Sequence, residues 1–175
     1  RVAALGEGVE GPAPGTLVAV SPSQPCGDCD YCRAGQPIHC LSMRFMGSAM
    51  RLPHEQGMFR DLLVVPAAQV HAFSDTTTPA EAACAEPLAV CLHAVAQATE
   101  LRPDLSALRV MVTGAGPIGL LVLAALRRQG ARDVIVTDLT DAALERARAM
   151  GAGAMINVAR EPPQTPTQRP WAGLP

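Results

Sequence analysis

The feature that most constrains the fold is an alternation of apolar runs and helical patterns in the second half of the chain. Apolar, β-branched runs at 109–114, 133–138 and 154–158 alternate with helical patterns at 117–130 and 141–151. Strands that alternate with helices form β-α-β units, whose strands pair in parallel. The sequence therefore predicts an α/β fold here, with part of a doubly wound parallel sheet.

The turn between the first of these strands and its helix reads VTGAGPIG, in which Gly114, Gly116 and Gly119 fit the pattern G-x-G-x-x-G. The pattern alone is weak, but the strand before it and the helix after it match a dinucleotide-binding turn. The first glycine permits the tight turn, the second lets a pyrophosphate approach, and the third allows close helix–strand packing. Pro117 and Ile118 fall inside this predicted cofactor site. An incidental glycine-rich turn is the alternative.

An acid follows the second strand of this region. Asp138 lies nineteen residues after Gly119, at the end of that strand. A carboxylate there can accept hydrogen bonds from both hydroxyls of an adenosine ribose, and it would repel a 2′-phosphate. The sequence thus favours NAD over NADP as cofactor. The alternative is a solvent-facing acid in an ordinary β-α-β unit.

The stretch PCGDCDYCRAGQPIHC, residues 25–40, holds four of the six cysteines with the spacing C-x2-C-x2-C-x7-C. Four thiolates saturate a tetrahedral zinc ion, so such a site is structural and its metal contributes to folding. Two disulfides would suit a secreted chain, and an iron–sulfur cluster shares the first spacings but not the next step to Cys-Pro. A closed zinc site is favoured over both. Its ligands would be Cys26, Cys29, Cys32 and Cys40.

The first hundred residues are expected to be β-rich. Strands are predicted at 1–5, 16–20 and 57–66, the last from an alternation of apolar side chains. An Ala-rich helical pattern follows over 76–98, and it opens with a Thr-Pro start signal. Pro87 predicts a break in this pattern, with a second helix beginning there.

Glu86 lies between two apolar runs of this helical region. A buried carboxylate is costly unless a cation or a hydrogen-bond donor meets it. Composition alone favours an exposed acid that interacts with the dipole of a helix start. Cys84 and Cys91 are expected to be small buried side chains, and His93 to be buried or hydrogen-bonded rather than a metal ligand.

Composition and charge narrow the classes of partner. A net charge of −2 and a pI near 6.1 give no electrostatic reason to expect nucleic acid or a membrane surface. The longest apolar run is too short to span a bilayer, and no secretion signal is visible, so the cytoplasm is expected. The chain opens with Arg1, and residues 161–175 are rich in proline. We expect a disordered tail there, and an internal fragment of a longer protein.

Taken in order, these motifs resemble a known family. The four-cysteine lobe, EPLAV..HA, V.GAGPIG and an acid after the next strand are similar to the zinc-dependent medium-chain dehydrogenases, best to their polyol and sugar-acid branch. The resemblance covers about residues 1–158. It implies a partial GroES-like catalytic domain over 1–100, with a zinc lobe at about 25–42. The N-terminal part of a Rossmann NAD-binding domain would follow over 101–160, and the tail over 161–175.

The resemblance also implies roles. The four cysteines match a structural zinc lobe, the glycine motif and Asp138 match the NAD site, and Glu86 matches a glutamate at the catalytic zinc, which it meets directly or through water. The expected reaction is oxidation of a secondary hydroxyl of a sugar acid or polyol, L-idonate to 5-ketogluconate favoured, with hydride transfer to NAD. Homodimers or homotetramers are expected for the complete enzyme.

Two motifs of the family do not occur in this sequence. The other catalytic-zinc residues of the family belong to a GICGSD-like turn and to GHE, and neither is found among the 175 residues. A zinc ion held by one carboxylate would not be retained. We therefore expect no turnover from this chain alone. The alternatives are a non-catalytic zinc-binding fragment, or an interaction module that pairs with a full-length subunit.

Overall fold

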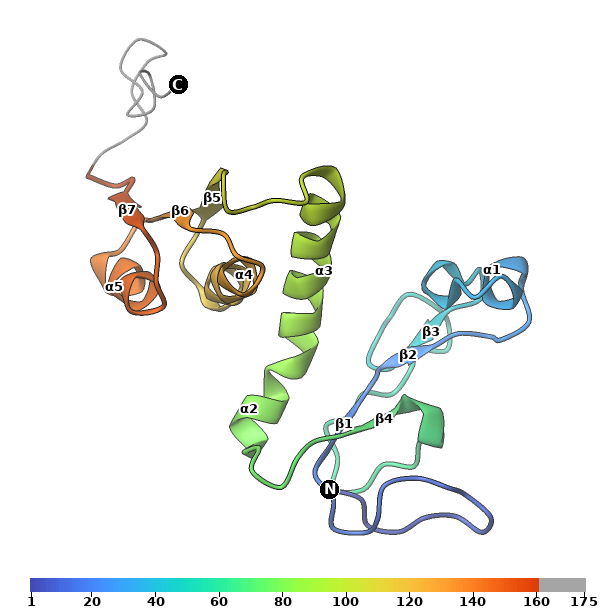
Figure 1. Cartoon of the computed structure of the whole chain (residues 1–175). Helices are drawn as coiled ribbons and strands as arrows, with labels where there is room; N and C mark the ends of the chain where they lie inside the picture. Colours follow the sequence, from blue (N-terminus) through green and yellow to red (C-terminus); the bar gives the residue numbers. More distant parts are fainter. Residues whose placement is uncertain (161–175) are drawn as a thin grey trace. The chain divides into compact units, whose positions relative to one another are not determined.

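The computed structural model describes residues 1–160, which fall into two compact units that divide between Ala83 and Cys84. Each unit is described by itself (Figure 1). The division comes earlier than the domain boundary expected near residue 100, because helix α3 (Ala85–Leu101) packs on α4 (Pro117–Arg128). The tail predicted at 161–175 lies outside the described residues.

The first unit contains a short antiparallel ribbon of β1 (Val18–Val20) and β4 (Val70–Ala72). β1 confirms the strand predicted at 16–20. Gln69 ends the 3-10 turn η2 (Ala67–Gln69) just before β4, and its side chain is buried. Its amide nitrogen donates to the carbonyls of Ser21 at 2.9 Å and Ser23 at 3.0 Å, so a polar side chain ties the ribbon to the following segment.

A second ribbon closes the base of the cysteine loop. β2 (Ser23–Gln24) pairs antiparallel with β3 (Arg44–Phe45). Between them the chain forms a short helix, α1 (Asp30–Arg33), and a 3-10 turn, η1 (Pro37–His39). The cysteine loop is therefore a lobe that leaves and rejoins one ribbon.

Two other predicted strands of this unit are wrong. Residues 1–5 form no strand, although the amide of Val2 donates to the Thr16 carbonyl at 3.0 Å. Residues 57–66 have no regular structure. A strand needs a neighbour for its backbone groups, and within residues 1–160 none pairs with this segment. Its apolar side chains are accordingly exposed: Phe59, Leu62 and Val64.

The Ala-rich helical region is confirmed as two helices. Thr78 caps α2 (Pro79–Ala83): its hydroxyl accepts the Glu81 amide at 3.2 Å, and the Glu81 carboxylate accepts the Thr78 amide at 2.8 Å. This reciprocal pair is a capping box. α3 follows after one residue, so the predicted break lies three residues before Pro87. Pro87 is tolerated in the first turn, where its missing N–H has no intrahelical partner.

The second unit is a β-α-β-α-β arrangement. β5 (Arg109–Thr113), β6 (Asp133–Asp138) and β7 (Ala154–Asn157) form a parallel sheet in the order β5-β6-β7. α4 and α5 (Asp141–Ala149) make the crossovers and lie on the same face of the sheet (Figure 1). The predicted α/β class, with part of a parallel sheet in the second half of the chain, is confirmed.

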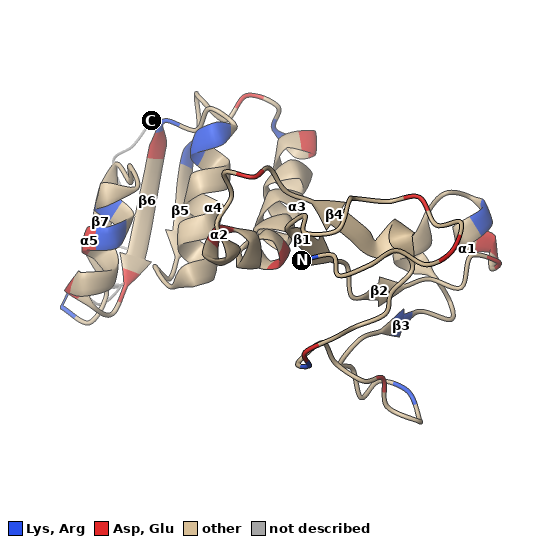
Figure 2. Cartoon of the chain, turned by 90° about the horizontal axis from the view of Figure 1, so that it is seen from below, with Lys and Arg blue, Asp and Glu red and all other residues tan. Residues whose placement is uncertain are grey.

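The core of the second unit lies between this sheet and its helices. Leu123 of α4 and Val134 and Val136 of β6 are fully buried. Burying one such side chain stabilises the fold by about 1.5–3 kcal/mol. β6 begins with Asp133 and ends with Asp138. Figure 2 shows acidic residues in red at both ends of this strand. None of the helices within residues 1–160 has the length and apolar character that crossing a membrane requires.

Candidate functional site

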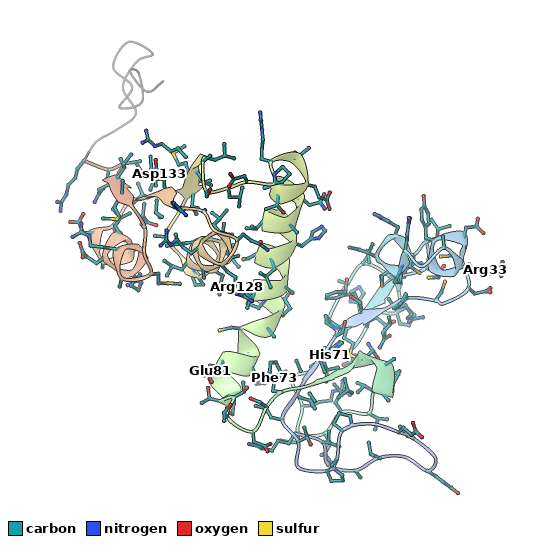
Figure 3. All side chains as sticks on the ribbon, in the orientation of Figure 1. Arg33, His71, Phe73, Glu81, Arg128 and Asp133 are labelled. Carbon is teal, nitrogen blue, oxygen red and sulfur yellow. The ribbon has the colours of Figure 1, made fainter. Side chains whose placement is uncertain are left out.

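The four cysteines of the lobe meet at one point. The Sγ atoms of Cys26, Cys29, Cys32 and Cys40 all lie within 4.8 Å of one another, and all are free thiols. Figure 3 shows sulfur atoms (yellow) gathered beside α1, near Arg33. Zinc–sulfur bonds of about 2.3 Å in a tetrahedron place sulfurs about 3.8 Å apart. A small contraction would therefore let this donor set hold a thiolate-binding metal, as the spacing predicted.

Backbone amides point at these sulfurs. The Cys26 sulfur accepts the amides of Asp28 at 3.5 Å and Cys29 at 3.4 Å, which lowers the pKa of Cys26 below its usual value. The Cys40 sulfur accepts the amide of Cys26 at 3.2 Å. Amide donors favour thiolate over thiol and orient metal ligands. The environment of the Cys26 sulfur therefore favours the metal-binding thiolate.

The pKa values of two neighbouring thiols are driven apart. The amides of Cys32 and Leu41 donate to the Cys29 sulfur and lower the pKa of Cys29 to about 6. Partial burial, with a hydrogen bond to Cys29, raises the pKa of Cys32 to about 12. At neutral pH the cluster holds a thiolate at Cys29 and a proton at Cys32. A metal that binds all four sulfurs must therefore displace a proton.

The glycine motif forms the turn between β5 and α4. Gly114 has a φ of +90°, in the left-handed region, and its amide donates to the Thr137 carbonyl at 2.7 Å. A Cβ on Gly119 would lie 1.8 Å from the Gly114 carbonyl oxygen, whereas one on Gly116 would meet open space. The predicted turn and packing roles match this geometry. Pro117 begins α4. The amides of a helix's first turn have no intrahelical acceptor and can bind an anion.

Asp138 lies next to the same turn. One carboxylate oxygen accepts the Ala115 amide at 2.8 Å, and the other accepts the Thr140 amide at 2.9 Å and its hydroxyl at 3.1 Å. The Ala115 amide, followed by that of Thr140, lowers the pKa of Asp138 below its usual value, so the group is an anion at neutral pH. The strand end and the glycine turn thus join into one anionic and amide-rich edge.

Sequence reasoning missed both partners of Asp138. The contact with Thr140 had a local signal, because an Asp side chain commonly accepts the backbone amide two residues further along the chain. The contact with Ala115 had none, because the two residues are separated by 23 positions along the chain.

Glu86 lies in the first turn of α3, exposed, without a hydrogen bond or ion pair to another described residue. Its role at a catalytic zinc therefore stays a prediction. Cys91 is buried, as expected, and its thiol donates to the Ile118 carbonyl at 3.6 Å. The expectation was wrong for Cys84, which precedes α3 and is exposed, and for His93, which lies in α3 and is exposed.

A cavity of about 580 Å³ lies along β5, between α3 and α4. β5 is an edge strand of the sheet that the described residues form. The walls are almost wholly apolar, and Gly114 and Gly116 border the cavity. Such walls suit apolar side chains better than the phosphates and hydroxyls of a nucleotide. We therefore place the candidate nucleotide site at the glycine turn and Asp138 rather than in this cavity.

Comparisons with known proteins give relatives for both units. The model of the alcohol dehydrogenase GroES-like domain matches residues 1–75. L-idonate 5-dehydrogenase (NAD(P)(+)) of Escherichia coli (strain K12) is 38% identical over 143 residues, which are 82% of this chain and 40% of that protein. L-threonine 3-dehydrogenase of Anaeromyxobacter dehalogenans (strain 2CP-C) is 39% identical over 161 residues, which are 92% of this chain and 44% of that protein.

Solved structures agree with these relatives. The crystal structure of L-idonate 5-dehydrogenase from Escherichia coli matches 82% of this chain and 40% of its own, with a TM-score of 0.74 and 38% identity. That of galactitol-1-phosphate dehydrogenase from Escherichia coli matches 90% of this chain and 43% of its own, with a TM-score of 0.74 and 31% identity. The chain thus spans about two fifths of the length of these relatives. With an alcohol dehydrogenase GroES-like domain over residues 1–75 and dehydrogenase relatives over most of its length, it is similar to the zinc-dependent medium-chain dehydrogenases.

Proposed function

We propose that this chain supplies the structural zinc lobe and the adenosine half of the NAD site of a dehydrogenase. The complete enzyme oxidises a secondary hydroxyl of a sugar acid or polyol, and L-idonate, which gives 5-ketogluconate, is the favoured substrate. The relatives named for L-idonate and galactitol 1-phosphate support this class of substrate. The relative named for L-threonine makes that amino acid the competing substrate. On the resemblance alone, we place the complete enzyme in the cytoplasm as a homodimer or homotetramer.

The observation that carries the cofactor assignment is the Asp138 carboxylate beside the glycine turn. Its bonds to the Ala115 and Thr140 amides hold it in place, and its lowered pKa keeps it charged. A fixed anion at this point accepts hydrogen bonds from ribose hydroxyls and repels a 2′-phosphate. We therefore assign NAD rather than NADP, although the name of the L-idonate relative includes both.

The two zinc assignments differ in kind. The lobe offers four thiols, which saturate a tetrahedral ion, so its zinc would stabilise the lobe and take no part in the reaction. A catalytic zinc, where bound, supplies Lewis-acid chemistry at the substrate hydroxyl. Glu86 is the residue of this chain that we assign to it, as a ligand or through a water molecule.

A second candidate function is a non-catalytic zinc-binding fragment or interaction module. It is favoured by one observation: neither a GICGSD-like turn nor GHE occurs in the 175 residues. With Glu86 as the single assigned ligand, this chain alone would not retain a catalytic zinc. We therefore expect no oxidation of L-idonate by the purified chain with NAD, and a measurable rate would overturn the expectation.

The experiment that tests the proposal measures the two half-sites separately. Zinc per purified chain is determined, and binding of ADP-ribose is compared by calorimetry with binding of 2′-phospho-ADP-ribose. We expect one zinc per chain and tighter binding of ADP-ribose, with the preference lost in Asp138→Asn. Equal binding of both ligands to the wild type would refute the NAD assignment. Two zinc ions per chain would mean that a catalytic site assembles here, and co-purification with a full-length homologue would support the interaction module.

A further inference from the structure

The segment that leaves the cysteine lobe is held by a side chain from outside it. Arg51 lies eleven residues after Cys40. Its Nε donates to the Met43 carbonyl at 3.0 Å, and its Nη2 donates to the Leu41 carbonyl at 2.9 Å. Both carbonyls belong to the three residues directly after Cys40. One guanidinium group thus fixes the backbone that follows the last cysteine of the cluster.

Leu41 links this guanidinium to the sulfurs. Its amide donates to the Cys29 sulfur, while its carbonyl accepts from Arg51. The Met43 amide donates in turn to the Cys40 carbonyl at 3.4 Å. Arg51 therefore orients Leu41, whose amide contacts the Cys29 sulfur and which directly follows Cys40 in the chain.

The loop that carries Arg51 is closed at its base. The Gly47 amide donates to the Gln56 carbonyl at 3.2 Å, and the Glu55 amide donates to the Ser48 carbonyl at 3.2 Å. Between these bonds the chain returns toward the lobe. A guanidinium presents several N–H donors in a rigid plane, so Nε and Nη2 can hold two nearby carbonyls at once, which a single ammonium group does less well.

The arginine inside the lobe is used differently. Arg33 pairs with Asp28 at 2.7 Å, and both side chains are exposed, so this ion pair contributes little. Arg51 has no acidic partner within residues 1–160, and its donors go to the two carbonyls instead. Its contacts are therefore directed at backbone geometry rather than at charge neutralisation.

We propose that Arg51 is a positioning residue for the four-thiol metal site. By holding the carbonyls of Leu41 and Met43, it fixes the backbone from which the Cys40 sulfur and the Leu41 amide face the cluster, and it slows metal loss. The proposal rests on the structural zinc proposed above. Partners that orient metal ligands from outside the site typically change metal affinity by about 10–100-fold.

The test uses the zinc-loaded 175-residue chain. Zinc affinity and the rate of zinc transfer to a chromogenic chelator are measured for the wild type, Arg51→Gln, Arg51→Lys and Arg60→Gln. The Arg60 side chain makes no hydrogen bond or ion pair with other described residues, so this variant controls for the change of charge. We expect about tenfold weaker zinc binding in Arg51→Gln, an intermediate loss in Arg51→Lys, and wild-type behaviour in Arg60→Gln.

A cobalt-loaded sample provides a readout that a general folding role would not change. We expect the d–d bands of Co²⁺ to shift in Arg51→Gln, while the charge-transfer intensity of four thiolates is kept. Wild-type zinc affinity in Arg51→Gln would overturn the inference and leave the zinc proposal intact. Wild-type affinity in Arg51→Lys would show that charge matters rather than the two-carbonyl contact, which also overturns it. If the zinc-loaded Arg51→Gln chain lost hydrogen-exchange protection in the β1–β4 ribbon, Arg51 would have a general folding role, and the inference would be overturned as well.

A wild-type chain without zinc would refute the zinc proposal itself, and the positioning role with it. This failure is visible in the wild type alone, so it is distinct from a failure of Arg51. In that case the rates of thiol alkylation of metal-free Arg51→Gln and Arg60→Gln are compared. A difference would show that the Arg51 contact affects the exposure of the cysteines without metal.

Discussion

The two compact units of this chain are held together in different ways. Residues 1–83 contain three buried residues, Cys40, Gln69 and Ala82, whereas residues 84–160 contain fourteen. The first unit relies on short ribbons, on the Gln69 amide and on bonds to sulfur. The second relies on an apolar core between a sheet and its helices. A polar loop without a core needs another source of stability, and a bound metal is one.

The largest effect is expected from removing the metal. Cys40→Ser deletes the buried ligand of the cluster, so zinc per chain should fall from one to none. Structural zinc in small peptides contributes about 10–16 kcal/mol of binding free energy, so the lobe should lose its fold. The second unit should be unaffected, which hydrogen exchange of the β5 and β6 amides will show. Cys84→Ser, outside the cluster, is the control.

Zinc binding to the wild type should also depend on pH. Because the pKa of Cys32 is about 12, its thiol is protonated at neutral pH and the metal must displace that proton. Zinc affinity should therefore rise with pH, by about tenfold per pH unit for each proton released. Retention of one zinc by Cys40→Ser, or an affinity that is flat between pH 6 and 8, would contradict the four-thiolate site.

The next effect separates the two units by packing. Leu123→Ala removes a fully buried side chain of the second unit and should cost about 2–5 kcal/mol in the free energy of unfolding. Leu62→Ala makes the same chemical change at a side chain that is 76% exposed in the first unit, and it should change stability by less than about 0.5 kcal/mol. Denaturant unfolding followed by circular dichroism measures both. Equal losses would remove the contrast between the units.

A smaller effect distinguishes two glycines of the turn between β5 and α4. Gly119→Ala places a Cβ against the Gly114 carbonyl and should cost about 1–3 kcal/mol, because backbone must move. Gly116→Ala meets open space at a φ of −74°, so thermal unfolding should barely change. It should instead weaken ADP-ribose binding, if a pyrophosphate approaches there. A Gly116→Ala chain that binds ADP-ribose normally would exclude this approach.

The two units also differ in how far their sequences predicted them. The strands expected at 109–114, 133–138 and 154–158 match the observed bounds within one residue, because each is a local apolar run bounded by turns. The strand expected at 57–66 did not form, because pairing depends on another strand and cannot be read from one segment. The local pattern of apolar residues therefore predicted strands well where neighbouring β-α-β elements pair with each other, and poorly where the partner strand must come from elsewhere.

The candidate sites show the same limit. The spacing of the four cysteines predicted that their sulfurs meet, and this is confirmed, although the identity of the metal stays a prediction. The contact of Arg51 with the segment after the lobe depends on how a loop folds back, which no spacing encodes. The bond from Ala115 to Asp138 depends on the parallel sheet placing the turn beside the end of β6.

The smallest effect concerns that bond and its pH dependence. Hydrogen bonds from the Ala115 and Thr140 amides lower the pKa of Asp138 in the folded chain below its ordinary value of 3.8. A carboxyl group with a depressed folded pKa stabilises the fold fully above its unfolded pKa, and the stabilisation is lost as pH falls through the folded pKa. The wild type should therefore exceed Asp138→Asn in stability by a constant amount from pH 8 to about pH 5. The difference should shrink below about pH 4 as the carboxylate takes up a proton.

Hydrogen exchange of the β5 and β6 amides, measured across this range, reports the stability of the second unit alone. Asp61→Asn makes the same change of charge at an exposed acid of the first unit, and it should leave that exchange unchanged at every pH. A difference between wild type and Asp138→Asn that persisted undiminished at pH 3 would mean that the carboxylate charge is not what the two amides stabilise. The glycine turn would then be held by packing at Gly119 alone, and the preference for NAD would lose its fixed anion.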